Sequence, residues 1–529
     1  MGDDISNYST LNQKLILIIF GLSGMTALIY EIVWIRPLTV VFGSTIYAVS
    51  IIVASFLVGL ALGSLIAGRY TDRLHNPLRY YGFIEIGIGL YGLMLISIFA
   101  VLPALYLSIY KATFSNLSLF FFLQMILSFT IILIPTTLMG ATLPIVMKSF
   151  SKKFESVGKD LGKLYSVNNF GAVIGTLVAG FLLIPLIGIK DSIIIAAIIN
   201  VIIGLVLLYR SKSLTVKKLI GIIIVTIALA SLVDYDYERL SFGMYSYADP
   251  SFEIKDFEKF LKESEFKFFK DGLYSTVAVV SNDKVDFMLK TGKSQCSNDP
   301  ATLKSMQRLA YLPYNMFENN YETPTKALNV GLGCGITSEW LSERIDTTTI
   351  EIDPTIVEAS KFFYDEIDHQ LIVDDARNWL LRNDVKYDII VTQPSDPFAG
   401  AWTLFTKEYF ELLNQRVTEN GIVSQWVPIF IMSVSDFDIY YNTFHSVFPY
   451  VYIYQMKEDS GQLIFLGSQN QLKIDDPHLY LLNNEDIPYI ETELNTDDRP
   501  ILEFSTAINV YNENPFPILE KINEWKKSK

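Results

Sequence analysis

The chain has 529 residues, of which 50% are apolar and only 19% are charged, and its mean hydropathy is +0.32. This balance is typical of a membrane protein with a soluble part attached, and it argues against a single soluble domain. The net charge of −14 argues against a nucleic-acid partner. Two cysteines are too few for a disulfide framework. Four histidines without ligand-like spacing argue against a zinc site.

Repeated apolar runs occupy residues 15–233. The candidate spans are Leu15–Trp34, Ile46–Gly68, Tyr81–Leu105, Leu117–Val146, Val173–Ile187, Ile193–Leu208 and Leu219–Val233. A bilayer core needs roughly 20 apolar helical residues per crossing, and the first four runs meet that length. The last run has only 15 residues, so it is either a short span or an interfacial helix. The first run is interpreted as a retained span, because Asp3 and Asp4 precede it instead of the basic region of a signal peptide.

Basic residues gather in three of the loops between these runs, at positions 69–79, 148–163 and 210–218. The positive-inside rule places such loops in the cytoplasm. If the last run crosses the bilayer, the domain that follows lies outside the cytoplasm. If that run lies flat on the membrane, the domain is cytoplasmic. Both orientations stay open for this expected multi-pass protein of the cell membrane.

Two carboxylates, Glu31 and Glu85, fall inside the apolar runs, where an ionisable group is costly and normally pairs or lines a cavity. One interpretation is a helix–helix contact, with Glu31 reaching Arg36 near the membrane interface. The other interpretation is a ligand path between the helices.

Beyond the apolar runs, charges become frequent and strand-like and helical patterns alternate, which is typical of a soluble α/β domain. The stretch "KALNVGLGCGITSEWL" predicts a strand at 328–330, a loop with Gly331, Gly333 and Gly335, and a helix from Thr337. Glycines let the backbone turn sharply and let a ligand approach closely. Alone, this pattern fits a tight strand–helix turn equally well.

The three strands that follow strengthen the functional interpretation. Glu351 ends the next strand, 16 positions after Gly335, where nucleotide-binding α/β folds place the acidic partner of the ribose diol. A third strand runs into Asp375 and Ala376, and a fourth ends at Gln393. Four consecutive strands therefore end in polar tips on one edge, where such folds bind their ligands. The pattern predicts an S-adenosylmethionine-type domain.

Residues 250–505 resemble the spermidine synthase (aminopropyltransferase) family through "GLGCGIT", "EIDPTIVEASKFF", "DDARNWL", "YDIIVTQPSDPFAG" and "NTDDRPILEF". The apolar half is similar to the membrane-fused spermidine synthase-like proteins through "LIYEIVWIRPL", "GLALGSLIAGRYTDR", "LMGATLPIV" and "LYSVNNFGAVIGTLVAGF". The resemblance implies a transmembrane domain of six or seven helices at 1–235, built like half of a major facilitator transporter. It also implies a small β-rich domain at 236–320 and a Rossmann-like domain at 321–529.

The resemblance further implies a co-substrate, decarboxylated S-adenosylmethionine or S-adenosylmethionine, and no metal. The residues that it assigns to this donor are Gln295, Gly331, Gly333, Gly335, Glu351, Asp375 and Ala376. Within that set, Glu351 would bind the ribose hydroxyls, Asp375 and Ala376 would lie at the adenine, and Gln295 in "TGKSQ" would close over the donor.

The acceptor side departs from the family. Gln393 stands where the family has the aspartate that helps deprotonate the attacking amine, and an amide cannot accept that proton at neutral pH. Gln307 stands where the family has a glutamate that helps hold the polyamine, and on the donor side Cys334 stands where the family has an aspartate that holds the donor's cationic amine. Each lost charge pair is worth about 1–3 kcal/mol. The residues expected at the reacting amine are Asp396, which matches the second aspartate of the tip, Gln393 and Tyr274.

Two functions follow. In the first, the protein transfers an aminopropyl or other alkyl group to an amine less cationic than putrescine, either a small molecule or an amphiphile in the bilayer. In the second, the cleft binds a nucleoside without catalysis, as a sensor or transporter accessory, and a pure transporter would need two chains paired as a homodimer. Two structural alternatives accompany them: Asp396 as a helix cap, and "NTDDRPILEF" as a terminal strand whose Arg499 bonds Asp497 or Asp498.

Overall fold

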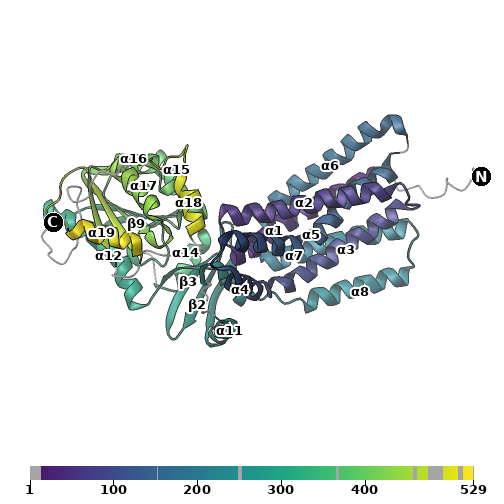
Figure 1. The fold of residues 1–529 in the computed structure, drawn as a ribbon, viewed down its shortest axis with the longest axis horizontal. Helices are drawn as coiled ribbons and strands as arrows, with labels where there is room; N and C mark the ends of the chain where they lie inside the picture. Colours follow the sequence, from purple (N-terminus) through teal and green to yellow (C-terminus); the bar gives the residue numbers. More distant parts are fainter. Residues whose placement is uncertain are drawn as a thin grey trace, which may run out of the picture. The chain divides into compact units, whose positions relative to one another are not determined.

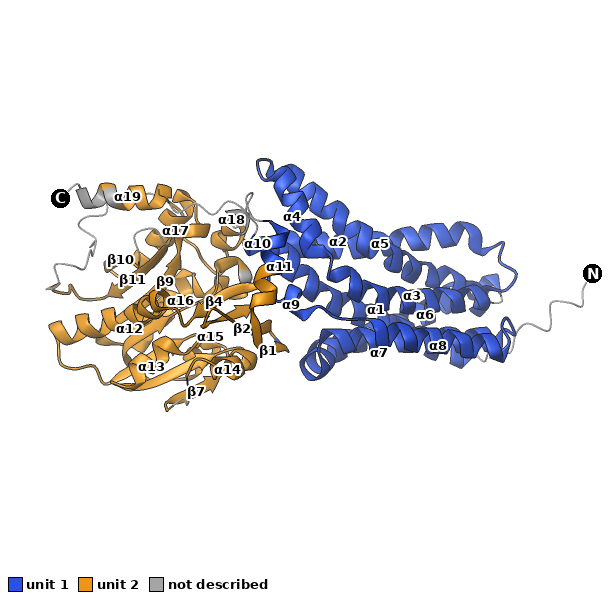
Figure 2. Ribbon diagram, turned by 90° about the horizontal axis from the view of Figure 1, so that it is seen from below, with its two compact units in different colours: residues 1–43, 47–258, 271–273 blue, residues 44–46, 259–270, 274–529 orange. Residues whose placement is uncertain are grey.

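The structure is a computed structural model that describes residues 13–151, 153–247, 253–364, 368–456, 461–474, 492–509 and 516–527. The chain divides into two compact units, which Figure 2 distinguishes by colour. Unit 1 comprises residues 1–43, 47–258 and 271–273, and unit 2 comprises residues 44–46, 259–270 and 274–529.

Unit 1 is helical (Figure 1). Its longer elements are α1 (Gln13–Phe42), α2 (Ile46–Thr71), α3 (Pro77–Phe99), α4 (Leu102–Thr113), α5 (Leu117–Phe150), α6 (Val157–Val178), the π-helix η2 (Ala179–Leu183), α7 (Ile184–Arg210) and α8 (Val216–Leu232). The short elements are η1 (Phe154–Ser156), α9 (Tyr237–Leu240) and α10 (Met244–Tyr247). Within the described residues, five helical stretches are long and apolar enough to cross a membrane, as the multi-pass prediction requires.

Two predicted spans have different bounds in the structure. The run Tyr81–Leu105 is interrupted, because α3 ends at Phe99 and α4 begins at Leu102, beside Pro103, which cannot donate a helical hydrogen bond. The fifth run continues a helix, α6, that begins at Val157, so the polar residues that lead into this run are helical as well. Gly188 separates the fifth and sixth spans with a left-handed backbone (φ 79°) inside the stretch assigned to α7.

Helices α3 and α7 pack backbone to backbone. A Cβ atom at Gly204 would lie 2.6 Å from the carbonyl oxygen of Gly82, and one at Gly89 would lie 2.8 Å from the carbonyl oxygen of Ala197. Small residues allow this approach, as is usual where membrane helices associate.

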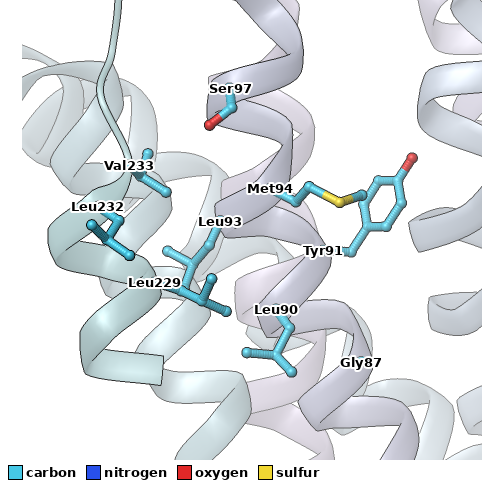
Figure 3. Close-up of a pocket in the computed structure, with 9 residues that line it drawn as sticks. All are labelled: Gly87, Leu90, Tyr91, Leu93, Met94, Ser97, Leu229, Leu232 and Val233. Atoms are coloured by element: carbon cyan, nitrogen blue, oxygen red, sulfur yellow. The ribbon is translucent and has the colours of Figure 1, made fainter. Parts of the chain in front are cut away.

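Helix α8 is 17 residues long and extends for about 25 Å at 1.5 Å per residue. It follows α3, because Leu219 near its start packs with Ile86 and its last residues line an apolar pocket against the second half of α3 (Figure 3). The residues that line this pocket are Gly87, Leu90, Tyr91, Leu93, Met94, Ser97, Leu229, Leu232 and Val233.

The two ends of the unit 1 helices are distinguished by their contacts. At one end, the Lys148 ammonium donates to the Thr71 carbonyl oxygen (2.8 Å), so the loop after α2 and the end of α5 lie together. The segment after α8 lies at the other end, where a Cβ atom at Gly243 would be 2.8 Å from the carbonyl oxygen of Val40, near the end of α1. The chain therefore passes from one end to the other along α8.

Unit 2 contains two sheets. The strands of the smaller sheet, in spatial order, are β1 (Glu265–Asp271), β2 (Thr276–Asn282), β3 (Val285–Lys290) and β4 (Lys293–Ser297). The larger sheet has the order β10-β11-β9-β8-β5-β6-β7. Its strands are β5 (Lys326–Val330), β6 (Asp346–Glu351), β7 (Gln370–Val373), β8 (Tyr387–Thr392), β9 (Val417–Pro428), β10 (Tyr450–Gln455) and β11 (Gln462–Ser468).

In the larger sheet, β7, β6, β5, β8 and β9 are parallel, and β11 and β10 extend it antiparallel. The helices are α11 (Ile254–Glu263), α12 (Pro300–Asn320), α13 (Ile336–Ser342), α14 (Pro354–Ser360), α15 (Ala376–Arg382), α16 (Lys407–Arg416), α17 (Val434–His445), α18 (Ile501–Asn509) and α19 (Phe516–Lys527). Short helical turns are η3 (Pro397–Ala401), η4 (Trp402–Leu404) and η5 (Ile429–Ile431).

Helices cover both faces of this sheet. Ile390 of β8 packs in a core with α15, α16 and α17, whereas its neighbours Ile389 and Val391 pack in a second core with α12 and α13. Alternate residues of one strand thus enter different cores, as expected for a parallel sheet buried on both sides. The predicted fold class, a set of apolar helices followed by a small β sheet and a Rossmann-like domain, is confirmed.

The predicted terminal strand in "NTDDRPILEF" is wrong. Pro500 precedes a helix, α18, in agreement with the preference of proline for helix starts. Arg499 forms its ion pair with Glu493 (2.8 Å) rather than with Asp497 or Asp498.

Candidate functional site

The carboxyl ends of β5, β6, β7 and β8 lie at one edge of the parallel sheet, so the predicted polar tips are neighbours. Two backbone hydrogen bonds tie them together, from Gly331 N to Ile350 O (2.8 Å) and from Gln393 N to Val330 O (2.9 Å). The sequence order of the strands therefore builds one continuous polar edge.

The three glycines after β5 all have positive φ, at 92°, 53° and 80°. A Cβ atom at Gly331 would lie 2.9 Å from the Gln393 carbonyl oxygen, and one at Gly335 would lie 2.1 Å from the Tyr364 ring. Glycine is therefore required here by backbone conformation and by space. The loop is the tight strand–helix turn expected from the sequence, and it leaves the edge beside Gly333 without a side chain.

Glu351 ends β6 with only 7% of its surface exposed. Its Oε2 accepts a hydrogen bond from Leu332 N (2.9 Å), and its Oε1 accepts one from Asp353 N (3.0 Å). A carboxylate has about four acceptor positions. The two bonds hold the side chain in place under the glycine loop and leave acceptor capacity for hydroxyl groups of a ligand.

Asp375 and Ala376 lie at the start of α15. Asp375 is the N-cap, since its Oδ1 accepts from Asn378 N (2.8 Å). Ala376 is the first residue of the helix and is buried. The cap fixes the turn between β7 and α15 at the same edge as Glu351.

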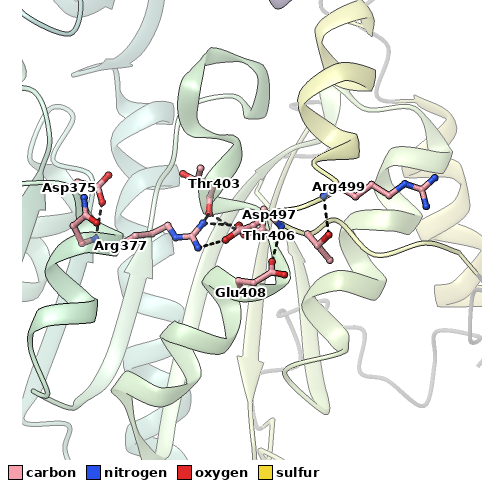
Figure 4. A network of polar contacts seen from close by, with 9 residues as sticks. Asp375, Arg377, Thr403, Thr406, Glu408, Asp497 and Arg499 are labelled. Carbon is pink, nitrogen blue, oxygen red and sulfur yellow. Dashed lines mark hydrogen bonds and ion pairs between the residues drawn. The ribbon is translucent and has the colours of Figure 1, made fainter.

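A network of polar contacts continues from this helix (Figure 4). Arg377 donates two bonds to the Asp497 carboxylate (2.9 and 2.6 Å) and one to the Thr403 carbonyl oxygen (3.0 Å). Thr406 also donates to Asp497 (2.7 Å), and Asp497 N donates to Glu408 (2.9 Å). The hydrogen bonds with Asp497 raise the pKa of Arg377, and the Arg377 guanidinium lowers the pKa of Asp497. The network fixes the segment that follows the β8 tip.

A disulfide joins Cys296 of β4 to Cys334 of the glycine loop. Both sulfur atoms are buried in a cluster with Leu332, Val277 and Ile356. Cys334, which the resemblance aligns with a family carboxylate, therefore carries no charge. The sequence does not predict this bond. The only available signal is that the chain's two cysteines each adjoin a predicted donor residue.

Gln295 lies in an irregular part of β4. Met288 pairs with Cys296 and Leu289 pairs with Ser294, so Gln295 is the extra residue of a bulge. Bulges often redirect side chains beside active sites. Its half-buried side chain is adjacent in sequence to the disulfide that links β4 to the glycine loop.

At the β8 tip, Asp396 is 4% exposed and forms an ion pair with the ammonium of Lys293. The same ammonium lies 4.9 Å from the centre of the Phe430 ring. Asp396 makes no side-chain capping bond to the turn that follows it, so the capping alternative fails. The sequence did not single out Lys293, although it lies two positions before Gln295.

Among the residues that the structure describes, the other side chains expected at the acceptor side form no hydrogen bond with this pair. Gln393 donates from its amide to the Met306 sulfur (3.1 Å). Tyr274 lies between β1 and β2 and is 51% exposed, and Gln307 is exposed on α12. Within the described residues, neither Tyr274 nor Gln307 is a hydrogen-bond partner of Asp396. The same part of the chain contains no group of three His, Cys, Asp or Glu side chains that could hold a metal ion.

Residues 322–468 match the family profile of the spermine/spermidine synthase domain. A polyamine aminopropyltransferase of Oceanobacillus iheyensis is 21% identical over 438 residues, which cover 78% of each chain. Spermine synthase SPE4 of Saccharomyces cerevisiae is 28% identical over 174 residues, covering 29% of this chain and 58% of the yeast protein. A spermidine synthase of Dictyostelium discoideum is 31% identical over 127 residues, covering 21% of this chain and 44% of that protein.

Among solved structures, a spermidine synthase in complex with the transition state analogue AdoDATO has a TM-score of 0.35 and 18% identity. It covers 45% of this chain and 85% of that chain. The resemblance expected from the sequence is confirmed by the family profile and the curated relatives, and this chain carries a spermine/spermidine synthase domain in its C-terminal part.

Proposed function

We propose that this protein is a membrane-bound transferase that moves an aminopropyl or other alkyl group from a sulfonium nucleoside to an amine. The observation that supports this most strongly is the shared edge of β5, β6, β7 and β8, with a glycine loop above a fixed, buried Glu351. The match of residues 322–468, which contain this edge, to the spermine/spermidine synthase profile supports aminopropyl transfer as the reaction.

The donor side suits a nucleoside. The free acceptor positions of Glu351 would take the two ribose hydroxyls, and the Asp375 carboxylate and Ala376 N would face the base edge at the start of α15. The absence of a side chain at Gly333 would admit the sulfonium end. The disulfide is neutral, so Cys334 would give no charge contact to an amine on the transferred group. The donor is decarboxylated S-adenosylmethionine or S-adenosylmethionine.

In the transfer step, the nitrogen lone pair of a neutral amine attacks the carbon bonded to the sulfonium sulfur. The new C–N bond forms as the C–S bond breaks, the sulfur takes the bonding pair, and the neutral thioether nucleoside leaves. The nitrogen then carries a positive charge and loses a proton to solvent or to a carboxylate. Because the sulfonium is already activated, orientation of the two partners supplies much of the rate.

The acceptor side opposes a polycation. The Lys293 ammonium already occupies the Asp396 carboxylate, and Lys290 reaches Ser395 of the same tip (3.5 Å). A second ammonium from a substrate would have to displace Lys293, and like charges at short range repel. We therefore infer an acceptor with few positive charges, such as an amphiphilic amine that reaches the site from the bilayer.

We further propose that unit 2 lies outside the cytoplasm. The three basic loops follow α2, α5 and α7, and the chain then passes along α8 to the opposite end of the unit 1 helices. Basic loops stay in the cytoplasm, so the following residues emerge on the other side. A disulfide between the only two cysteines agrees with this side, because disulfides persist in oxidising compartments.

The alternative function is a nucleoside-binding sensor or transporter accessory. It is favoured by Gln393, whose amide cannot act as a base, and by the pairing of Asp396 with Lys293. The two functions differ in whether the donor is consumed.

The full-length protein in lipid nanodiscs, incubated with decarboxylated S-adenosylmethionine and a panel of amines, separates these functions. We expect release of methylthioadenosine, measured by mass spectrometry, in the presence of a long-chain monoamine, and slower release with putrescine. No release with any amine, together with saturable donor binding, would reject the transferase and favour the sensor. Release that is independent of any amine would reject transfer to an amine and also contradict the sensor.

A further inference from the structure

A fully buried carboxyl group lies among the apolar helices of unit 1. Glu85 of α3 has 0% exposure. The Ser23 hydroxyl of α1 donates to its Oε1 (2.5 Å), and the Asn200 amide of α7 donates to its Oε2 (2.5 Å). One carboxyl group thus joins three helices, which confirms the predicted helix–helix contact for Glu85.

The surroundings of Glu85 are tight. Gly82 and Gly89 lie about one helical turn on either side of it, and both bring α3 into backbone contact with α7. Close contact of the two backbones leaves the carboxyl group between protein atoms rather than facing water. In this arrangement of the helices, the group exchanges protons with solvent only if the helices move apart.

No positive charge compensates this carboxyl group. Within the described residues, no Lys, Arg or His forms an ion pair with Glu85. The predicted ion pair between Glu31 and Arg36 is not formed in this part of the chain either. The titratable groups that face Glu85 are the phenols of Tyr30 on α1 and Tyr81 on α3, and α5, α7 and α8 contribute no charged group to its interactions. A lone carboxylate buried in this way is strongly disfavoured.

A protonated carboxyl group, by contrast, needs one acceptor for its own hydroxyl. Two buried oxygen atoms close by have no hydrogen-bond partner in the part of the chain that the structure describes: the Tyr30 hydroxyl and Oδ1 of Asn200. Each is able to accept a hydrogen bond. The surroundings therefore offer acceptors for the hydroxyl of the neutral acid, whereas no cation among the described residues balances the buried anion.

We propose that Glu85 is a proton-binding site of the membrane helices, occupied when α1, α3 and α7 pack as they do in this structure. Proton release requires these helices to separate, so that water or a cation reaches the carboxylate. Proton binding and helix packing are then linked, because each favours the other. This role is independent of the transferase reaction at unit 2, and it gives the helices a function beyond anchoring.

Infrared difference spectroscopy on the full-length protein in nanodiscs, over a pH series, tests the proposal. We expect a carbonyl band of a buried carboxylic acid at neutral pH in the wild type and its complete loss in Glu85→Gln. The matched control Glu31→Gln, which alters a partly exposed carboxyl group of α1, should keep the band. Identical spectra for the wild type and Glu85→Gln would overturn the proposal, because Glu85 would then be ionised.

The Glu85→Gln protein should fold, because Asn200 can turn its amide and offer Oδ1 to the new amide group. If it does not fold, Ser23→Ala provides a second test. Loss of the Ser23 hydroxyl removes a donor that stabilises the anion more than the acid. The pH at which the band disappears should therefore rise, and an unchanged midpoint would overturn the proposal.

Discussion

Breaking the Cys296–Cys334 disulfide should destabilise unit 2 by about 4 kcal/mol. The two cysteines are 38 positions apart, and closing a loop of that length in the unfolded chain costs about 13 cal/mol/K, or about 4 kcal/mol at 25 °C. For a domain of this size, a loss of that magnitude lowers the melting temperature by roughly 8–16 °C. The loss originates in the unfolded chain, so the folded contacts need not change.

The assay is thermal unfolding of the full-length protein in detergent, followed by intrinsic fluorescence with and without a reductant. The double variant Cys296→Ser/Cys334→Ser should unfold at the temperature of the reduced wild type. The reductant should not affect that variant, which serves as its own control. Two freely reactive thiols in the untreated, folded wild type would refute the reasoning, as would equal melting temperatures for the oxidised and reduced forms.

Three further changes probe the tip and its supports. Lys293→Met should increase the turnover of cationic amines such as putrescine at least several-fold in steady-state assays, because it frees the Asp396 carboxylate. The control Lys290→Met should change this turnover little. Equal effects of the two substitutions would contradict the ion-pair argument. Gln393→Asp should also raise the rate with putrescine, because it restores a proton acceptor, and Gln393→Asn should not. The pKa of Asp497 is lower in the folded protein than its value of about 3.9 in the unfolded chain, so its ionised form stabilises the fold at any pH above about 3.9. This contribution to the free energy of unfolding is lost as the pH falls through the folded pKa. Asp497→Asn should therefore flatten acid unfolding in that window, whereas Asp498→Asn should reproduce the wild-type curve.

The long apolar helices of unit 1 were largely predictable, because hydropathy depends on composition over one helix length. Its errors have local causes. The residues between Phe99 and Leu102 are apolar, so no change in polarity marks the break between α3 and α4. The first half of α6 is polar and exposed, and hydropathy alone does not recognise a helix of that kind.

The strand tips were predictable for a similar reason. The strands β5, β7 and β8 contain short apolar runs and β6 is rich in β-branched threonine, and parallel strands connected through helices end on the same edge. Gly331, Glu351 and Asp375 therefore came to one edge from their positions in sequence alone.

The partners of the site residues were not predictable. The Lys293–Asp396 pair joins positions 103 apart, and the Arg377–Asp497 pair joins positions 120 apart. Such contacts depend on how the smaller sheet and the terminal segment lie against the strand tips within unit 2. No local pattern in the chain encodes them.

The central claim is that a sulfonium nucleoside binds at the strand tips with its ribose on Glu351. Isothermal calorimetry of methylthioadenosine with the full-length protein tests this most directly. Binding should be saturable in the wild type and absent in Glu351→Ala. The control variant Glu358→Gln, which alters an exposed carboxylate on α14 that pairs with Lys270, should bind as the wild type does. Equal affinity of the wild type and Glu351→Ala, or no binding by the wild type, would contradict the account.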